Sequence, residues 1–263
     1  ALGPCGQRSG YQHPKDPSRF CLIIPSYHTP TMDFEAQISY RDGLILGLIH
    51  LFGISYFVCF VVSFFLYHFP KSPGAILKAQ VVTFYSMGVL LWELSSLTCH
   101  SSWIFHGDKT APWGKSQMAA TMALIYTTAV PSIAAAYRQQ SYLRSVYLSG
   151  LTSLAISKIS AILAQTSDAS MARSSFHWDC LWLGFWALVP SVHALQTQES
   201  PPSLTINFVR VTTWNLLAAA GCAAQVPERL GVVGHWHPSL YAMHLVLVWS
   251  SISYAQGVWD MVL

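Results

Sequence analysis

The chain has 263 residues, of which 52% are hydrophobic and only 10% are charged, and its mean hydropathy is +0.39. Soluble domains carry about 25% charged residues, so this composition predicts an integral membrane protein rather than a soluble globule. The formal net charge of +3 is too small and too scattered to indicate a nucleic-acid-binding surface.

Residues 1–42 contain no long apolar run and are predicted to form a polar N-terminal tail. The rest of the chain, residues 43–263, is predicted to form one membrane domain with seven apolar segments. These segments run over residues 43–68, 80–100, 117–137, 143–164, 177–196, 205–226 and 239–259. Each has roughly the 20 residues that a membrane-crossing helix needs. Backbone polar groups in lipid must be satisfied within the segment, so the prediction is an all-α, seven-transmembrane helix bundle.

Lysine and arginine are unevenly distributed over the joints between these segments. Eight lie on the side of the N-terminus and four on the other side. Cytoplasmic loops carry an excess of these residues, which predicts a cytoplasmic N-terminus. The eight are Arg8, Lys15, Arg19, Arg41, Lys109, Lys115, Arg173 and Arg229, and the four are Lys71, Lys78, Arg138 and Arg144.

The second segment carries three polar residues with helical spacing. Glu93, Ser96 and His100 are spaced i, i+3 and i+7, which places them on one face of a helix. An ionisable residue within a membrane helix indicates a functional site, and an unpaired carboxyl in a low dielectric can act as an acid. The alternative for Glu93 is a structural ion pair with Lys158 of the fourth segment. For His100 alone, a hydrogen-bonded histidine at a helix end is the simpler interpretation.

Other polar and aromatic residues within the segments have a structural and a functional interpretation. His50 and His193, taken singly, are more typical of satisfied polar residues than of ligands. Tryptophans in membrane proteins usually form interfacial belts, but three lie deeper along their segments. The predicted substrate cavity is lined by Trp92, Ser96, Gln117, Trp186, His193 and Trp214.

Five short motifs lie in order between about residues 46 and 256. They are "IHLFG" around His50, "SLTCH" ending at His100, "AVP" ending at Pro131, "LVPSVH" ending at His193, and "VPERL" before the last segment. In this order they resemble the progestin and adipoQ receptor family, which includes adiponectin receptors and haemolysin III-like proteins. The resemblance implies a seven-helix bundle with a cytoplasmic N-terminus, a lipid-sized cavity and a buried zinc ion.

The resemblance also implies ligands for this zinc, and here the chain departs from the pattern. The family uses one histidine of S-x-x-x-H, matched by His100, and two of H-x-x-x-H on the last helix, of which His244 matches the second. Leu240 stands in place of the first. Gln117 stands where the family has an aspartate that supports the bound water. His237, about 10 Å before His244 along a regular helix, is the remaining candidate for the third ligand, or a loop residue.

Three functions therefore stay open. The first is an intramembrane enzyme that isomerises or cyclises a lipid or isoprenoid by acid–base chemistry. Its catalytic residues would be Glu93 as proton donor, with His100 and His244 as polar partners. The second is a zinc-dependent receptor or lipid-amide hydrolase with zinc at His100, His244 and His237, although only two of these match the family and catalytic zinc needs three protein ligands.

The third is a non-catalytic lipid-binding membrane protein. No nucleotide-binding glycine loop, H-E-x-x-H or aspartate-rich prenyl motif occurs in the chain. Nucleotide hydrolysis and the soluble type of metal-dependent prenyl chemistry are therefore disfavoured.

Overall fold

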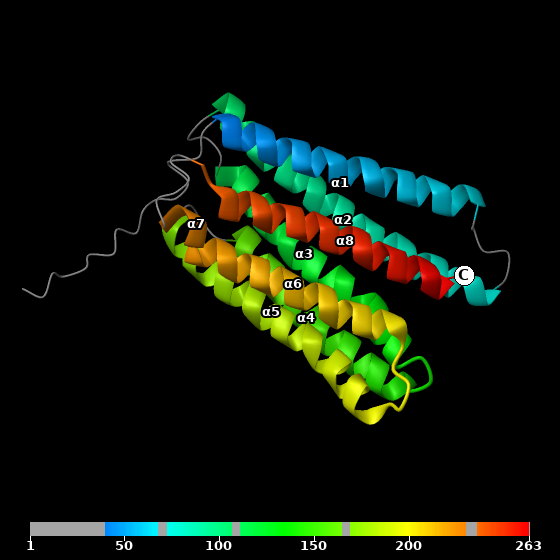
Figure 1. Cartoon of the computed structure of the whole chain (residues 1–263). Helices are drawn as coiled ribbons and strands as arrows, with labels where there is room; N and C mark the ends of the chain where they lie inside the picture. The colour runs from blue at the N-terminus through cyan, green and yellow to red at the C-terminus, as the bar shows by residue number, and fades with distance from the viewer. Residues whose placement is uncertain (1–39, 68–72, 107–110, 165–168, 230–235, 263) are drawn as a thin grey trace, which may run out of the picture. The chain divides into compact units, whose positions relative to one another are not determined.

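A computed structural model describes residues 40–67, 73–106, 111–164, 169–229 and 236–262. Within these ranges the chain forms seven long helices and one short helix, and no strand. They are α1 (Tyr40–Tyr67), α2 (Pro73–His106), α3 (Ala111–Ala136), α4 (Ser141–Ala164), α5 (Ala169–Thr197), α6 (Ser203–Ala224), α7 (Val226–Arg229) and α8 (Pro238–Val262) (Figure 1). The prediction of an all-α bundle of seven long helices is confirmed.

Each predicted apolar segment lies on one long helix. Where a segment extends past the end of its helix, it does so by at most two residues. Four helices are long and apolar enough to cross a membrane by length and composition alone, namely α1, α4 and the stretches Ala79–Ser102 of α2 and Gly114–Ala136 of α3. Large apolar side chains also point outward from the other long helices, for example Phe185 of α5, Leu217 of α6 and Trp249 of α8. Such a surface is suited to lipid, and the chain is an integral membrane protein.

The order of packing brings the two ends of the chain's helical part together. Helix α2 packs between α1 and α3, while α8 packs against α1, α2 and α6. In Figure 1, α1, α2 and α8 run side by side, and α3 to α6 form the remainder of the bundle. Residues that are far apart in the sequence on α1, α2 and α8 can therefore meet inside one bundle.

Helix α1 begins at Tyr40, a few residues before the first predicted apolar segment, which starts at residue 43. Residues 1–39 lie outside the described residues, so the polar tail stays a prediction. The fifth apolar segment carries one acidic residue near its start, Asp179, and this residue has a partner. Asp179 of α5 accepts a hydrogen bond of 2.5 Å from Lys158 of α4, which pairs the two charges between neighbouring helices.

Candidate functional site

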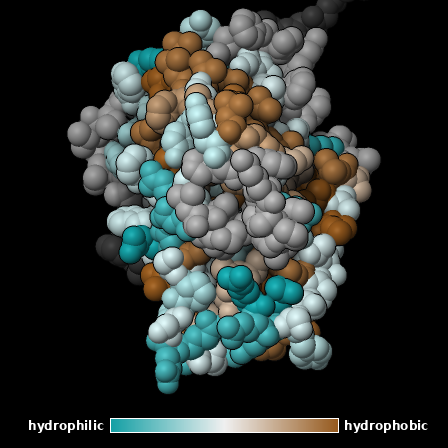
Figure 2. Space-filling view, turned by 90° about the vertical axis from the view of Figure 1, so that its right-hand side faces the viewer, coloured by the Kyte–Doolittle hydropathy of each residue, from teal (hydrophilic) through white to brown (hydrophobic). Residues whose placement is uncertain are grey.

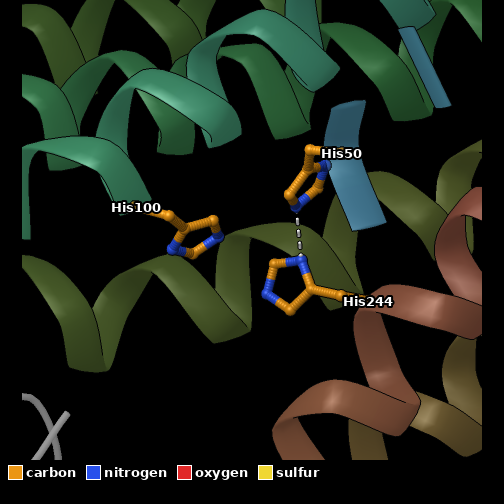
Figure 3. A group of neighbouring side chains, drawn as sticks. All are labelled: His50, His100 and His244. Atoms are coloured by element: carbon orange, nitrogen blue, oxygen red, sulfur yellow. Dashed lines mark hydrogen bonds between the residues drawn. The ribbon is translucent and has the colours of Figure 1, made fainter. Parts of the chain in front are cut away.

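Three histidines from three helices meet inside the bundle. His50 of α1, His100 of α2 and His244 of α8 each place one ring nitrogen within 4.8 Å of the others (Figure 3). All three side chains are buried. His50 Nε2 and His244 Nδ1 are 2.9 Å apart and share a hydrogen bond, and the rings of His100 and His244 are nearly perpendicular, with centroids 5.1 Å apart. We call these three residues the histidine cluster.

The cluster forms because its three helices reach the same level of the bundle. His50 lies about 15 Å from the start of α1, and His244 about 9 Å from the start of α8, at 1.5 Å per residue. His100 lies about 9 Å from the end of α2, which runs in the opposite direction. The start of α1, the end of α2 and the start of α8 are at the same end of the bundle (Figure 1).

A buried carboxyl group contacts the cluster from α2. Glu93 Oε2 lies 2.6 Å from His50 Nδ1, and both side chains are fully shielded. Glu93 Oε1 has no hydrogen-bond partner among the described residues. The predicted structural pair of Glu93 with Lys158 is wrong, because Lys158 binds Asp179 instead. Glu93 thus lies on the face of α2 that meets α1, beside the histidines.

The close approach of Glu93 to α1 depends on a glycine one turn after His50. A Cβ atom at Gly53 would lie 2.6 Å from Glu93 Cδ, well inside the distance that real Cβ contacts allow. Only a residue without a side chain leaves space for the carboxyl group there. The spacing of His50 and Gly53 in "IHLFG" therefore has a structural explanation. His50 contacts the carboxyl group of Glu93, and Gly53 leaves space for it.

Of the predicted cavity residues, Trp92 contacts the cluster, and Ser96 and Gln117 lie on the adjoining parts of α2 and α3. Trp92 is buried and presents its ring at 78° to that of His50, with centroids 5.1 Å apart. Ser96 is buried one turn before His100, and Gln117 Nε2 of α3 donates to Ser96 Oγ at 3.4 Å. The helical face predicted from the spacing of Glu93, Ser96 and His100 is thus the face that points into the bundle.

The other three predicted cavity residues lie elsewhere. Trp186 is 46% exposed and Trp214 is 56% exposed, so both lie on the outer surface of the bundle and not in its interior. His193 Nδ1 of α5 is within hydrogen-bond distance of two tyrosine hydroxyls, 3.0 Å from Tyr137 and 2.8 Å from Tyr147. Depth along a segment does not reveal which face is inward, and indole is tolerated by lipid, so the sequence misplaced the two tryptophans.

His237 is not a member of the histidine cluster and His50 takes its place. His237 directly precedes α8, and its carbonyl accepts hydrogen bonds from the amides of Leu240 and Tyr241. Close by, Glu228 of α7 accepts hydrogen bonds from the amide of Ser239 at 2.9 Å and from its hydroxyl at 2.6 Å. The "VPER" motif therefore caps the start of α8. His237 belongs to this capping region, at the level where the helix begins.

The structure thus brings together His50, His100, His244 and Glu93. Sequence reasoning selected three of the four for the site and treated His50 as a satisfied polar residue. The signal available in the sequence was a histidine within an apolar segment with Gly53 one turn later, where the structure shows space for a group from another helix. Leu240, which stands where the resembling family has a histidine, is buried one turn before His244.

Comparison with known proteins agrees with this architecture. No family model matches the chain. The chain is 25% identical over 227 residues to "Heptahelical transmembrane protein 1" of Arabidopsis thaliana, a similarity that covers 81% of this chain and 68% of that protein. Together with the seven long helices, this similarity supports a distant relation to heptahelical transmembrane proteins. The chain is an integral membrane protein whose described residues form seven long helices around three buried histidines that could hold a metal ion.

Proposed function

We propose that the protein binds a zinc ion at His50, His100 and His244 and hydrolyses an acyl bond of a lipid within the membrane. One observation carries this proposal: His50 presents Nε2 to the histidine cluster while its Nδ1 meets the carboxyl group of Glu93. Histidines that bind metal almost always have their second ring nitrogen hydrogen-bonded to a carboxylate, carbonyl or water.

The donor set fits zinc in number and type. Three histidine nitrogens converge from three helices within 4.8 Å of one another. Three protein ligands with a remaining open position are typical of catalytic zinc, and three histidines form one of its known ligand sets.

A zinc ion held by His50, His100 and His244 would supply a water of lowered pKa and a Lewis acid for the carbonyl group of an acyl substrate. The chain's own residues would orient the histidine ligands and transfer protons to and from the reacting groups. Glu93 Oε2 accepts the Nδ1 proton of His50, which leaves the lone pair of Nε2 directed at the cluster. Glu93 Oε1, which has no partner among the described residues, can receive a proton from a nearby reacting group.

Gln117 has a different role from the aspartate that the resemblance would place there. Its amide nitrogen donates to Ser96 Oγ, and an amide acts neither as an acid nor as a base at neutral pH. In this protein the transfer of protons therefore falls to Glu93. Trp92, packed edge-on against His50, limits how the imidazole can turn.

The position of the site favours a bond near the head of a lipid over one in its tail. The three histidines lie about 9 to 15 Å from the helix ends. Half of the hydrocarbon core is about 15 Å thick, and the headgroup regions add several ångströms. An amide or ester that joins an acyl chain to its head is at a comparable depth. We therefore propose a lipid amide or ester as the substrate class.

A second candidate function follows from one specific observation. Glu93, His50 and His244 form a continuous chain of hydrogen bonds of 2.6 and 2.9 Å. Such a chain can move a proton without a metal, with Glu93 as the acid. An isoprenoid isomerase or cyclase would use this arrangement, with the Trp92 face stabilising positive charge.

Metal analysis of the purified full chain separates the two. We expect one zinc per chain in the wild type, lost in His50→Ala, His100→Ala and His244→Ala. The matched controls His193→Ala and His237→Ala should retain zinc, since neither residue belongs to the cluster. Hydrolysis of a fluorogenic N-acyl lipid amide should then follow the zinc content.

Three results would contradict all or part of the proposal. If His237→Ala loses zinc while His50→Ala keeps it, the ligand set predicted from the sequence is the correct one. If the wild type contains no zinc and converts an isoprenoid substrate in a manner that depends on Glu93, the acid–base function is supported instead. Zinc without turnover of any acyl lipid would leave a lipid-binding or receptor role.

A further inference from the structure

A groove with two charged side chains lies at the other end of the bundle. It lies between α6 and α8, has a volume of about 440 Å³, and is lined by residues that include Ser203, Asn207, Arg210, Ser253, Gln256 and Asp260. We call it the polar groove. Asp260 is 16 residues after His244 on the same helix, about 24 Å along its axis. Figure 2 faces this end of the bundle and shows hydrophilic side chains gathered on its lower half.

The polar groove is built where α6 and α8 approach closely. Asn207 Nδ2 donates to the carbonyl oxygen of Ser253 at 3.4 Å. A Cβ atom at Gly257 would lie 2.6 Å from the same Asn207 nitrogen. A larger residue at Gly257 would push the helices apart, so the small residue places the polar side chains of both helices next to one another.

Arg210 and Asp260 line this groove with opposite charges. Both side chains are exposed, and neither forms an ion pair with another residue in the described part of the chain. Arg210 lies about 10 Å from the start of α6, within reach of the headgroup layer if its side chain extends toward the end of the helix. A charge at this level is stable when it meets a lipid headgroup or water.

A second groove joins the first along α8. It lies between α1 and α8, has a volume of about 390 Å³, and shares Gln256 and Asp260 with the polar groove. Aromatic rings from Tyr56, Phe60 and Trp259 also line it, and the ring centroids of Phe60 and Trp259 are 5.2 Å apart. We call it the aromatic groove. Aromatic faces beside a carboxylate are a recognised arrangement for binding a quaternary ammonium group.

We propose that the two grooves together bind one phosphatidylcholine molecule from the surrounding membrane. The guanidinium of Arg210 binds the phosphate in the polar groove, since the planar fork of arginine matches phosphate oxygens. The trimethylammonium group lies by Asp260, against the rings of the aromatic groove. One positive and one negative side chain complement a zwitterionic headgroup, whereas an anionic headgroup would be repelled by Asp260. This binding site is independent of the proposed metal site.

Native mass spectrometry of the purified full chain tests this proposal, with phosphatidylcholine and phosphatidylglycerol of identical acyl chains as probes. We expect the wild type to bind phosphatidylcholine more tightly. Arg210→Gln should weaken this binding about tenfold, as expected for the loss of a charge-assisted hydrogen bond. Arg138→Gln is the matched control, because Arg138 is exposed at the same end of the bundle and outside both grooves.

The variant Asp260→Asn tests the ammonium contact separately. It should weaken binding of phosphatidylcholine and strengthen binding of phosphatidylglycerol, so that the preference between the two lipids is reduced or reversed. Soluble phosphocholine should compete with the lipid better than inorganic phosphate does. Equal competition by the two would mean that only phosphate is recognised, and would overturn the assignment of the ammonium group to Asp260.

Equal affinity of the wild type for both lipids would also overturn the proposal, as would an Arg210→Gln variant indistinguishable from Arg138→Gln. Circular dichroism establishes that each variant is folded. If Arg210→Gln loses helix, Arg210→Lys keeps the charge without the planar fork and should still weaken binding measurably. Zinc content should be the same in all these variants. The lipid-binding proposal can therefore fail while the zinc proposal holds, and the zinc proposal can fail while the lipid-binding proposal holds.

Discussion

The carboxyl group of Glu93 lies 2.6 Å from Nδ1 of His50, with both side chains fully shielded in the interior of the bundle. This contact links α1 to α2 and leaves the second nitrogen of His50 directed at His244. The proposed zinc site depends on it, because a carboxylate on the far nitrogen orients a ligating imidazole and makes it a better donor. The first prediction tests this contact directly.

Replacing Glu93 with glutamine should lower the affinity for zinc by about 10- to 100-fold, since a neutral amide at this position no longer orients His50 as a carboxylate does. Competition with a chromophoric chelator measures the affinity. Lys158→Ala is the control, because Lys158 pairs with Asp179 and not with Glu93. An unchanged affinity in Glu93→Gln would show that Glu93 does not support the ligand.

Gly53→Ala should destabilise the protein and weaken the metal site together. The added methyl group would lie 2.6 Å from Glu93 Cδ, and overpacking of this kind costs about 1–3 kcal/mol. Thermal unfolding in detergent and zinc content are the measurements. Gly150→Ala provides the contrast, because no heavy atom lies within 4 Å of a Cβ at that helical position. There alanine should be neutral or stabilising by up to about 1 kcal/mol.

Tyr241→Phe should destabilise the contact between the first and last helices. The hydroxyl group of Tyr241 in α8 donates a hydrogen bond to the carboxylate of Asp42 in α1, whose side chain is fully buried. Without the hydroxyl group, the buried carboxylate of Asp42 loses a hydrogen bond, which should lower the free energy of unfolding by about 1–3 kcal/mol. The melting temperature reports this loss. Tyr142→Phe should have no effect, since Tyr142 is 78% exposed, and an equal loss in both variants would contradict the interpretation.

The cap on α8 should make stability depend on acid. Burial tends to raise the pKa of Glu228, but the hydrogen bonds from the hydroxyl and amide of Ser239 outweigh it and lower the pKa below its ordinary value. A carboxyl group with a lowered pKa stabilises the fold above the pKa of the unfolded chain. That contribution is lost as the pH falls through the folded value.

Glu228→Gln should therefore reduce stability at neutral pH by about 1 kcal/mol, the usual worth of a helix cap. Its difference from the wild type should shrink toward acidic pH. Melting temperatures measured from neutral to acidic pH provide the comparison, with Glu199→Gln as the control because Glu199 is exposed in the joint between α5 and α6. A constant difference at every pH would exclude the titration of Glu228 as its cause.

The seven long helices could be predicted from the sequence alone. An apolar run long enough to cross a membrane must satisfy its backbone locally, so the seven segments could be located without knowledge of their neighbours. The spacing of Glu93, Ser96 and His100 likewise determined which face of α2 is inward, since all three positions lie on one helix. The same local reasoning does not predict whether an amphiphilic side chain such as that of Trp186 faces the bundle interior or the lipid.

Which residues of different helices meet depends on how the helices pack, and this could not be predicted from the sequence. His50 and His244 are 194 positions apart and share a hydrogen bond because α1 and α8 are neighbours that start at the same end of the bundle. No periodicity within a segment encodes which helices are neighbours. The sequence therefore favoured His237, which is close to His244 along the chain, whereas packing placed His50 beside it, with Glu93 in the space that Gly53 leaves open.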